Sequence, residues 1–240
     1  MDKEMFFTEI TQNAEIINEH ISQKQSEDFY KYMKLLIEWN NKINLTAITD
    51  EKEIILKHFI DSITINKYLK GKENVLDIGT GAGFPGMPLK ILNNDINFTL
   101  ADSLNKRIMF LEEVCKELEL KNINCVHGRA EELGNNVNYR EKYDIVTSRA
   151  VAKLNVLLEY MLPFVKIGGE CICMKGPNIK EEVEEIDYAL KVLGGKIKEV
   201  KNMFLPNSDN ERNIIVIEKV HSTPSKYPRK AGIPTKQPLV

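Results

Sequence analysis

Residues 75–91, VLDIGTGAGFPGMPLKI, decide the fold of this chain. The short run from Val75 to Ile78 has the composition of a buried strand, and four glycines and two prolines follow it within ten positions. Glycine permits backbone conformations and close approaches that other residues disfavour. A strand that ends in such a loop is typical of the ligand-binding edge of an open parallel sheet. The stretch therefore predicts an α/β fold with a ligand at the end of its first strand.

Strand-like and helix-like segments alternate from here to the end of the chain. The predicted strands lie in NVLDIG, NFTLADS, NINCVHG, YDIVTSRA, GGECICMKG, GKIKEVKNMFL and RNIIVIEKV. Helices are predicted for residues 106–120, 151–165 and 178–193, with a further helical segment at AEEL. Only the short link PNSDNE separates the last two strands, which favours a hairpin. We expect a seven-stranded, mostly parallel sheet that ends in an antiparallel hairpin.

The segments before and after this α/β region differ from it. Apolar residues from Phe7 to Ile21 and from Phe29 to Ile37 recur at helical spacing, and a third helix is predicted from Asp50 or Glu51 to about Leu69, with Gly71 as its stop. Four prolines after residue 221 predict an extended tail on the surface. We divide the chain into an N-terminal helical extension (1–70), a core (71–220) and a basic, Pro-rich tail (221–240), all within one structural domain.

Composition excludes several classes of protein. The 240 residues carry a net charge of −2, but the tail is +4, which leaves −6 for residues 1–220. A basic tail on an acidic body suggests contact with a polyanion, and a merely solvated tail is the alternative. The charged N-terminus is neither a signal peptide nor an anchor, and no run approaches the roughly 18 apolar residues of a membrane span. We expect a cytoplasmic protein without a membrane contact.

The four cysteines include no CxxC motif. Cys171 and Cys173 alternate within one predicted strand, so both should face the core on the same side as unreactive thiols. No metal site is expected.

Two classes of ligand could bind the glycine loop, namely a dinucleotide and a ligand that joins an adenosine to an amino-acid tail. A dinucleotide site requires G-x-G-x-x-G, but Phe84 occupies the position of the third glycine, and Pro85 opposes a helix start directly after Gly81. A ligand with an adenosine and an amino-acid tail carries no phosphate, so it depends less on a helix N-terminus directly after the glycines. Asp77 would favour a cationic ligand over a pyrophosphate. Asp102, at the end of the second strand, is placed to accept hydrogen bonds from ribose hydroxyls of either ligand.

Seven short sequence blocks, spread in order along nearly the whole chain, narrow the choice between these two classes of ligand. They are WNNKINLTAI, HFIDSI, LDIGTGAGFPGMPLKI, ADSLNKRIMFLEEV, HGRAEEL, DIVTSRAVAKL and RKAGIPTKQPL. Together they resemble the bacterial RsmG family, also called glucose-inhibited division protein B. The resemblance implies a Rossmann-like methyltransferase fold and transfer of a methyl group from S-adenosyl-L-methionine to N7 of a guanosine in 16S ribosomal RNA. The partner would be 16S rRNA, free or in the small ribosomal subunit or its precursor, and the enzyme would act as a monomer.

The resemblance also assigns residues to the cofactor. They are Gly79, Phe84, Asp102, Ser103, Ala130, Glu131 and Arg149, and the loop geometry adds Gly81. Phe84 would wall the site, and Ala130 and Glu131 would lie beside the adenine. Arg149 ends the fourth strand, where it would bind the methionine carboxylate or an RNA phosphate.

His58, Asp61 and Ser62 share one face of the third predicted helix. They suggest a hydrolase triad, but the strained G-x-S-x-G turn is missing, so we expect His58 and Asp61 to line the substrate side of the cleft or to join helices. In the tail, Lys226, Arg229 and Lys230 would hold phosphate, and Tyr227 would stack on a base.

Guanine N7 has a lone pair and no proton, so the reaction needs alignment and exclusion of water rather than a general base. We therefore predict no acid or base, and regard Arg149 and His58 as orienting groups only. The sequence pattern leaves three alternative functions open. They are a methyltransferase of a protein or small molecule, a non-catalytic RNA-binding assembly factor, and an NAD enzyme.

Overall fold

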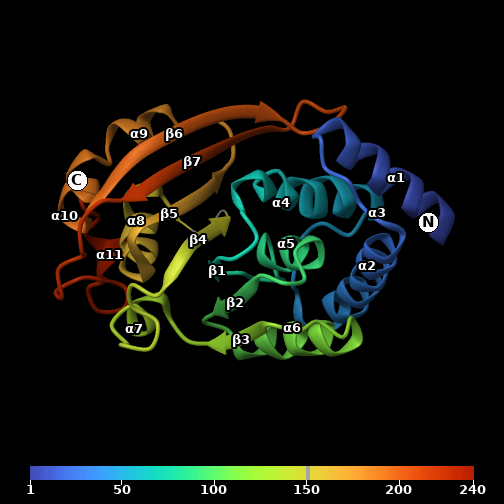
Figure 1. Cartoon of the computed structure of the whole chain (residues 1–240), viewed down its shortest axis with the longest axis horizontal. Coiled ribbons are helices and arrows are strands. Elements are labelled where there is room, and N and C mark those ends of the chain that lie inside the picture. The colour runs from blue at the N-terminus through green and yellow to red at the C-terminus, as the bar shows by residue number, and fades with distance from the viewer. Residues whose placement is uncertain (150–151) are drawn as a thin grey trace.

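The computed structural model describes residues 1–149 and 152–240, within which seven strands form a single sheet (Figure 1). The strands are β1 (Asn74–Ile78), β2 (Asn97–Asp102), β3 (Ile123–His127), β4 (Tyr143–Arg149), β5 (Val165–Lys175), β6 (Gly195–Phe204) and β7 (Glu211–Lys219). Their order is β3-β2-β1-β4-β5-β7-β6. The first five are parallel, and β7 runs antiparallel to both β5 and β6. The predicted sheet, with its terminal antiparallel hairpin, is confirmed.

Strand β1 lies in the interior of the sheet, third in this order. It pairs with β2 on one side and with β4 on the other, so the strand order reverses beside it. Open α/β sheets bind ligands at such a reversal, beyond the carboxyl ends of the strands. The glycine loop after β1 and Arg149 at the end of β4 both lie at this edge.

The N-terminal region is helical, as predicted. Its elements are α1 (Lys3–Ile16), α2 (Gln23–Ile43), α3 (Glu51–Ile54), a π-helical segment η1 (Ile55–Ile60), α4 (Asp61–Ile63) and a 3-10 turn η2 (Asn66–Tyr68). Ser22 and Gln25 form a reciprocal capping box that begins α2. The third helix begins after Asp50, as expected, but it is not one α-helix to Leu69. It widens into a π-helix at Ile55 and ends near Ile63.

Two layers of helices cover the sheet. On one side, a single apolar cluster joins Phe6, Phe59 and other N-terminal residues to α5 (Gly86–Leu92) and α6 (Asn105–Glu117). On the other side, α8 (Leu154–Met161) and α10 (Asp187–Leu193) pack on β4, β5 and β7. Figure 1 shows α1 and α2 at one end of the molecule and the C-terminal elements at the other. Within the described residues, no helix is both long and apolar enough to cross a membrane.

Some predicted boundaries were wrong. The helix expected over 151–165 is α8, a 3-10 turn η3 (Leu162–Phe164) and the first residue of β5, because Pro163 cannot donate to a continuing α-helix. Its first predicted residue, Val151, lies outside the described residues. The helix expected over 178–193 is divided into α9 (Lys180–Glu184) and α10, separated by the fully buried Ile186. Cys171 and Cys173 are free and buried on one face, as predicted.

Candidate active site

The glycine loop connects β1 to α5. Gly79, Gly81 and Gly83 have φ angles of 67°, 63° and 102°, a region that side chains with a Cβ disfavour. The N–H of Gly79 donates to the carbonyl of Ala101 at 2.8 Å, which ties the loop to β2. A Cβ on Gly81 would meet no atom within 4 Å, so this part of the loop faces open space. Helix α5 begins only at Gly86, as the prolines predicted.

Asp77 has another role than the one expected from the sequence. Its side chain is completely buried, and its Oδ2 accepts hydrogen bonds from the Thr80 hydroxyl at 2.6 Å and the Gly86 N–H at 2.8 Å. Burial raises the pKa of this carboxyl to about 7, against the opposing effect of those two donors. Asp77 therefore braces both ends of the loop from beneath and does not face a cationic ligand.

Asp102 lies at the end of β2, as predicted, with 3% of its surface exposed. Its carboxylate accepts the N–H groups of Gly81 and Leu104, each at 2.9 Å, and Arg107 Nη1 at 3.1 Å. Arg107, in the first turn of α6, was missed by the sequence reasoning, because one arginine among many surface charges carries no signal. Asp102 thus holds the glycine loop and the start of α6 together.

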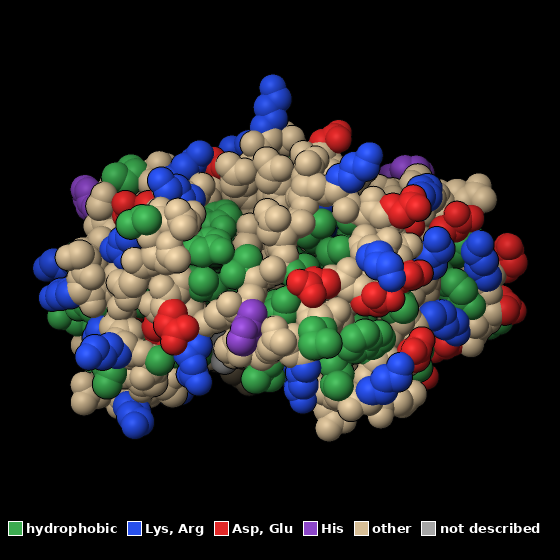
Figure 2. All heavy atoms as spheres, turned by 90° about the horizontal axis from the view of Figure 1, so that it is seen from below, with side chains coloured by type: hydrophobic (Ala, Val, Ile, Leu, Met, Phe, Trp, Pro, Cys, Tyr) green, Lys and Arg blue, Asp and Glu red, His purple; other side chains and the backbone are tan. Residues whose placement is uncertain are grey.

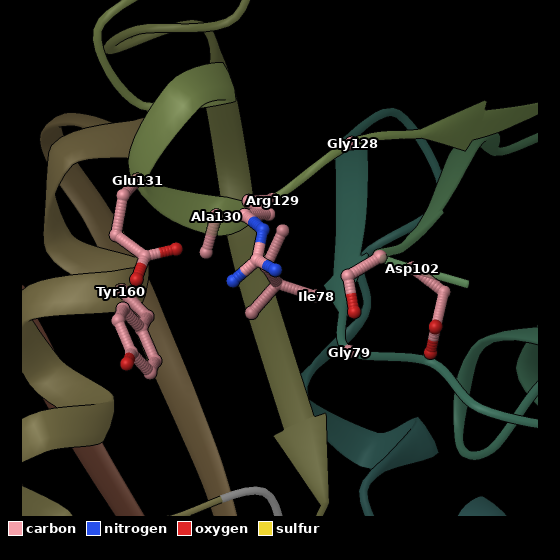
Figure 3. A pocket seen from close by; sticks show the side chains of 9 residues that line it. Ile78, Gly79, Asp102, Gly128, Arg129, Ala130, Glu131 and Tyr160 are labelled. Carbon is pink, nitrogen blue, oxygen red and sulfur yellow. The ribbon is translucent and has the colours of Figure 1, made fainter. Parts of the chain in front are cut away.

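A cavity of about 190 Å³ opens where β1, β2 and α7 (Ala130–Leu133) meet (Figure 3). Its lining residues are Ile78, Gly79, Asp102, Ser103, Gly128, Arg129, Ala130, Glu131 and Tyr160. In Figure 3 the carboxylates of Glu131 and Asp102 lie on opposite sides, with the guanidinium of Arg129 between them. Neither Arg129 nor Tyr160 was predicted.

A second cavity, of about 430 Å³, adjoins the first and shares Gly79, Asp102 and Ser103 with it. The rest of its lining is Leu45, Thr46, His58, Thr80, Gly81, Ala82, Phe84, Arg107 and Arg149. Every residue predicted to contact the cofactor therefore lines one of these two cavities. Their contacts with a bound cofactor remain predictions.

Arg149 organises the far wall of the second cavity. Its Nη1 donates to the Lys57 carbonyl at 3.0 Å and to Asp61 Oδ2 at 3.2 Å, and its Nη2 donates to His58 Nδ1 at 3.0 Å. Asp61 Oδ2 also accepts a 2.9 Å hydrogen bond from Arg212 Nε. The predicted residues His58, Asp61 and Arg149 thus form one cluster. Arg212 was not predicted, because 151 residues separate it from Asp61 and no local pattern marks it.

His58 is held as a neutral ring. Its Nδ1 accepts from Arg149, so its Nε2, 2.8 Å from the Thr46 hydroxyl, carries the proton. Burial, and next the charge of Arg149, lower its pKa to about 3. The ring stacks on Phe84 at a centroid distance of 4.3 Å. Ser62 donates to the His58 carbonyl at 2.5 Å rather than to its ring, so the three residues form no hydrolase triad.

The tail is attached to the body and includes one helical turn, α11 (Ile233–Lys236), where an extended chain was expected. Arg229 Nη2 donates to Glu159 Oε2 at 2.6 Å, and Glu159 is completely buried. Tyr227 is 5% exposed, so the expectation that it stacks on a base was wrong. Lys226 and Lys230 are exposed. The N–H of Gly232 donates to Glu131 Oε1 at 3.2 Å, which places the tail beside the first cavity.

Comparison with known proteins identifies the family. The model of the family described as rRNA small subunit methyltransferase G matches residues 25–215. The chain belongs to this family. It is 53% identical over 232 residues to "Ribosomal RNA small subunit methyltransferase G" of Alkaliphilus oremlandii, covering 96% of this chain and 97% of the relative. It is 56% identical over 221 residues to the protein of the same name from Acetivibrio thermocellus, covering 92% and 91%.

Solved structures agree on the fold. The chain superposes on M. jannaschii TYW2 in complex with AdoMet with a TM-score of 0.52 and 17% identity, covering 67% of this chain and 77% of the other. It superposes on a precorrin-6y C5,15-methyltransferase of Geobacter metallireducens with a TM-score of 0.51 and 14% identity, covering 74% and 92%. As a member of the methyltransferase G family, this chain is a methyltransferase that uses S-adenosylmethionine, and the NAD alternative is excluded.

The residues around the two cavities fit this cofactor. Among residues 1–149 and 152–240, three buried side-chain atoms have no hydrogen-bond partner, namely Asp61 Oδ1, Asp77 Oδ1 and Arg107 Nε. Buried polar atoms are seldom left unpaired, and all three belong to residues that line or brace this edge of the sheet. The adjoining cavities have room for a nucleoside in one part and an amino-acid group in the other.

Proposed function

We propose that this methyltransferase transfers a methyl group to N7 of a guanosine in 16S rRNA of the small ribosomal subunit. The name shared by its family and its relatives supports rRNA of the small subunit as the substrate. The proposal of N7 rests on the sequence resemblance and on the chemistry of the site. Such a substrate implies action in the cytoplasm, and we propose that the enzyme acts as a monomer.

The observation that carries the proposal is the shared wall formed by His58 and Arg149. On one side of this wall lies the second cavity, next to the glycine loop. On the other side lies a third cavity, of about 290 Å³, over the ends of β4 and β5. A base bound in the third cavity would lie across His58 and Arg149 from a methyl donor bound in the second cavity. A flipped nucleotide commonly reaches an enzyme site in this way.

S-adenosylmethionine supplies a methyl group already activated by its sulfonium. The chain's own residues have to bind, orient and exclude water. Asp102 and the glycines hold the nucleoside and its tail, and Phe84 closes the wall beneath His58 and Arg149. A neutral His58, already hydrogen-bonded through both ring nitrogens, is suited to orientation rather than to proton transfer. This agrees with a nucleophile that carries no proton.

Charge on the surface gives further support. Figure 2 shows Lys and Arg predominating at the end that carries the C-terminal elements in Figure 1, while both signs mix elsewhere on that face. Basic side chains bring a protein to RNA through its phosphates, without reading the sequence. Lys226 and Lys230 in the tail are the residues that we assign to phosphate. Arg229 is already engaged by Glu159, so its predicted contact with RNA is the weakest of the three.

The test is to map N7-methylguanosine in small-subunit RNA by borohydride and aniline cleavage, in a strain with and without the gene. We expect one cleavage site to disappear with the gene and to return with the wild-type chain. An unchanged pattern would contradict the proposal. A protein or small-molecule methyltransferase, or an assembly factor without catalysis, would give that result.

Calorimetry separates the cofactor from the substrate. Glu131→Gln should weaken binding of S-adenosylhomocysteine about 3- to 10-fold, because a hydrogen-bonding group in the first cavity is altered. Glu132→Gln is the matched control, since Glu132 is exposed and lies outside both cavities. Equal affinities in the two variants would remove Glu131 from the cofactor site.

A further inference from the structure

One turn of the C-terminal tail contacts two side chains of the first cavity. Glu131 and Tyr160 both line that cavity, and Figure 3 shows them together on the side opposite Asp102. The N–H of Gly232 donates to Glu131 Oε1 at 3.2 Å, and the Tyr160 hydroxyl lies 3.1 Å from Thr235 Oγ1. Gly232 immediately precedes α11 and Thr235 lies within it, so both contacts come from the same turn. This turn therefore supports one wall of the first cavity from outside.

The segment that carries the turn is itself fixed to the body. Arg229, before the turn, donates from Nη2 to the buried carboxylate of Glu159, which directly precedes Tyr160 on α8. The same Nη2 donates to the carbonyl of Gln237, after the turn, at 2.8 Å. One guanidinium therefore joins both ends of the turn to α8. The contacts of the turn with the cavity wall are made from a fixed position.

The two supported groups are polar and mobile by nature. A glutamate side chain and a tyrosine ring can each adopt several rotamers, and a ligand that has to order them loses binding free energy. A hydrogen bond from a fixed partner selects one arrangement before the ligand binds. Binding sites depend on such supporting contacts as well as on the groups that touch the ligand.

We propose that the turn from Gly232 to Lys236 positions the cofactor, with Thr235 acting through Tyr160 and the Gly232 N–H acting through Glu131. Neither Gly232 nor Thr235 lines the first cavity in the described part of the chain, so both are positioning residues and not contact residues. The inference rests on the proposed assignment of the first cavity to the cofactor. It does not depend on which base is methylated.

A competing explanation is that these hydrogen bonds only attach the tail to the body. The Gly232 N–H belongs to the backbone, so substitutions of the exposed Thr235 separate the two explanations. Thr235→Val replaces the hydroxyl by a methyl group of similar size. We expect its Kd for S-adenosylhomocysteine, measured by calorimetry, to rise about 3- to 10-fold, because one hydrogen bond that fixes the wall is lost. Its urea midpoint of unfolding should equal that of wild type.

Two further variants serve as controls. Thr235→Ser keeps the hydroxyl and should bind S-adenosylhomocysteine like wild type. Thr8→Val makes the same exchange at an exposed residue of α1, at the other end of the molecule in Figure 1, and should also bind like wild type.

A double-mutant cycle tests whether Thr235 acts through Tyr160. If it does, Thr235→Val combined with Tyr160→Phe should bind S-adenosylhomocysteine as weakly as Tyr160→Phe alone. Kinetics give a second measurement. In Thr235→Val the KM for S-adenosylmethionine should rise about 3- to 10-fold, while kcat on small-subunit particles stays within about twofold of wild type, because only binding of the cofactor is weakened.

Three results would overturn the inference. They are wild-type affinity in Thr235→Val, an equal loss of affinity in Thr235→Ser, and effects of Thr235→Val and Tyr160→Phe that add in the combined variant. The Glu131→Gln measurement identifies a failure of the cavity assignment itself. If Glu131→Gln binds like its control, both proposals fall, whereas weakened binding in Glu131→Gln with wild-type affinity in Thr235→Val removes only the role of the turn.

Discussion

At the scale of single residues, Asp77 and His58 show how burial sets charge in this site. The charge of Arg149 acts on the pKa of both side chains, but burial has the largest effect and opposes the charged form of each. Asp77 is driven toward its protonated state and His58 toward its neutral state. Arg149 therefore contacts a neutral His58 ring and the Asp61 carboxylate, while the raised pKa of the buried Asp77 favours its protonated form.

Asp77→Asn should change how stability depends on pH. Folded Asp77, with its pKa raised to about 7, keeps its proton up to that pH, whereas in the unfolded chain the carboxyl has its ordinary pKa of 3.8. The folded state therefore binds more protons between these values, and wild-type stability falls as pH rises, by at most about 1.4 kcal/mol per pH unit. An asparagine does not titrate, so relative to wild type the variant should gain stability between pH 4 and 7.

Urea unfolding at pH 5 and pH 8 measures this difference. His58 contributes to the slope of the free energy of unfolding against pH with the opposite sign, because its pKa is lowered by folding. This contribution is the same in wild type and in Asp77→Asn, so it cancels when the two proteins are compared. Asp95→Asn, which alters an exposed carboxylate, should show no such gain. A difference between Asp77→Asn and wild type that does not change with pH would contradict the prediction.

At the scale of elements, α2 supports the glycine loop. The Tyr32 hydroxyl donates to the Ala82 carbonyl, and a Cβ on Gly83 would lie 2.6 Å from that hydroxyl oxygen. The Tyr32 ring also lies 5.7 Å from the Phe84 ring and is completely buried. The N-terminal helices therefore act on the cofactor site through packing as well as through His58 and Asp61. We propose on this basis that residues 1–70 belong to the same structural domain as the core.

Tyr32→Phe should loosen the loop. The change leaves the Ala82 carbonyl without its donor, at a cost of about 1–3 kcal/mol in the free energy of unfolding. Binding of S-adenosylhomocysteine should weaken with it, because Ala82 lines the second cavity. Thermal unfolding and calorimetry measure the two effects. Tyr30→Phe on the same helix is the control, since Tyr30 is half-buried and makes no hydrogen bond to the loop. Equal behaviour of the two variants would contradict this role.

At the scale of the whole molecule, the tail ties distant parts of the chain together. Arg140 donates to the carbonyls of Thr223, Pro224 and Tyr227 as well as to that of Gly134. Arg229 reaches Glu159 on α8, which is 70 residues away in the sequence. The tail thus has a structural part, around Arg229, and an exposed basic part at Lys226 and Lys230.

Arg229→Gln and Lys230→Gln should separate these two parts. Loss of Arg229 leaves the buried Glu159 carboxylate without its cation, and we expect a cost of about 2–3 kcal/mol in the free energy of unfolding because Arg229 is partly exposed. Lys230→Gln should leave that free energy unchanged. It should instead lower affinity for small-subunit RNA and reduce the slope of log affinity against log salt concentration by about one.

Denaturant unfolding and RNA binding at several KCl concentrations measure both variants. The assignment of Lys230 fails if its variant binds RNA with an unchanged salt slope. The structural role of Arg229 fails if its variant unfolds like wild type.

The sequence by itself determined the seven strands, their order along the chain and the cofactor loop, because each of these follows from local patterns. Glycines and prolines mark the loop, apolar runs mark the strands, and the position of Asp102 and Arg149 follows from where their strands end. Only the tertiary structure decided how these residues are used. Asp77 turned beneath the loop, Tyr227 became buried, and Arg212 joined Asp61 across 151 residues. Such pairings depend on how helices and strands pack, which places side chains together that no spacing along the chain relates.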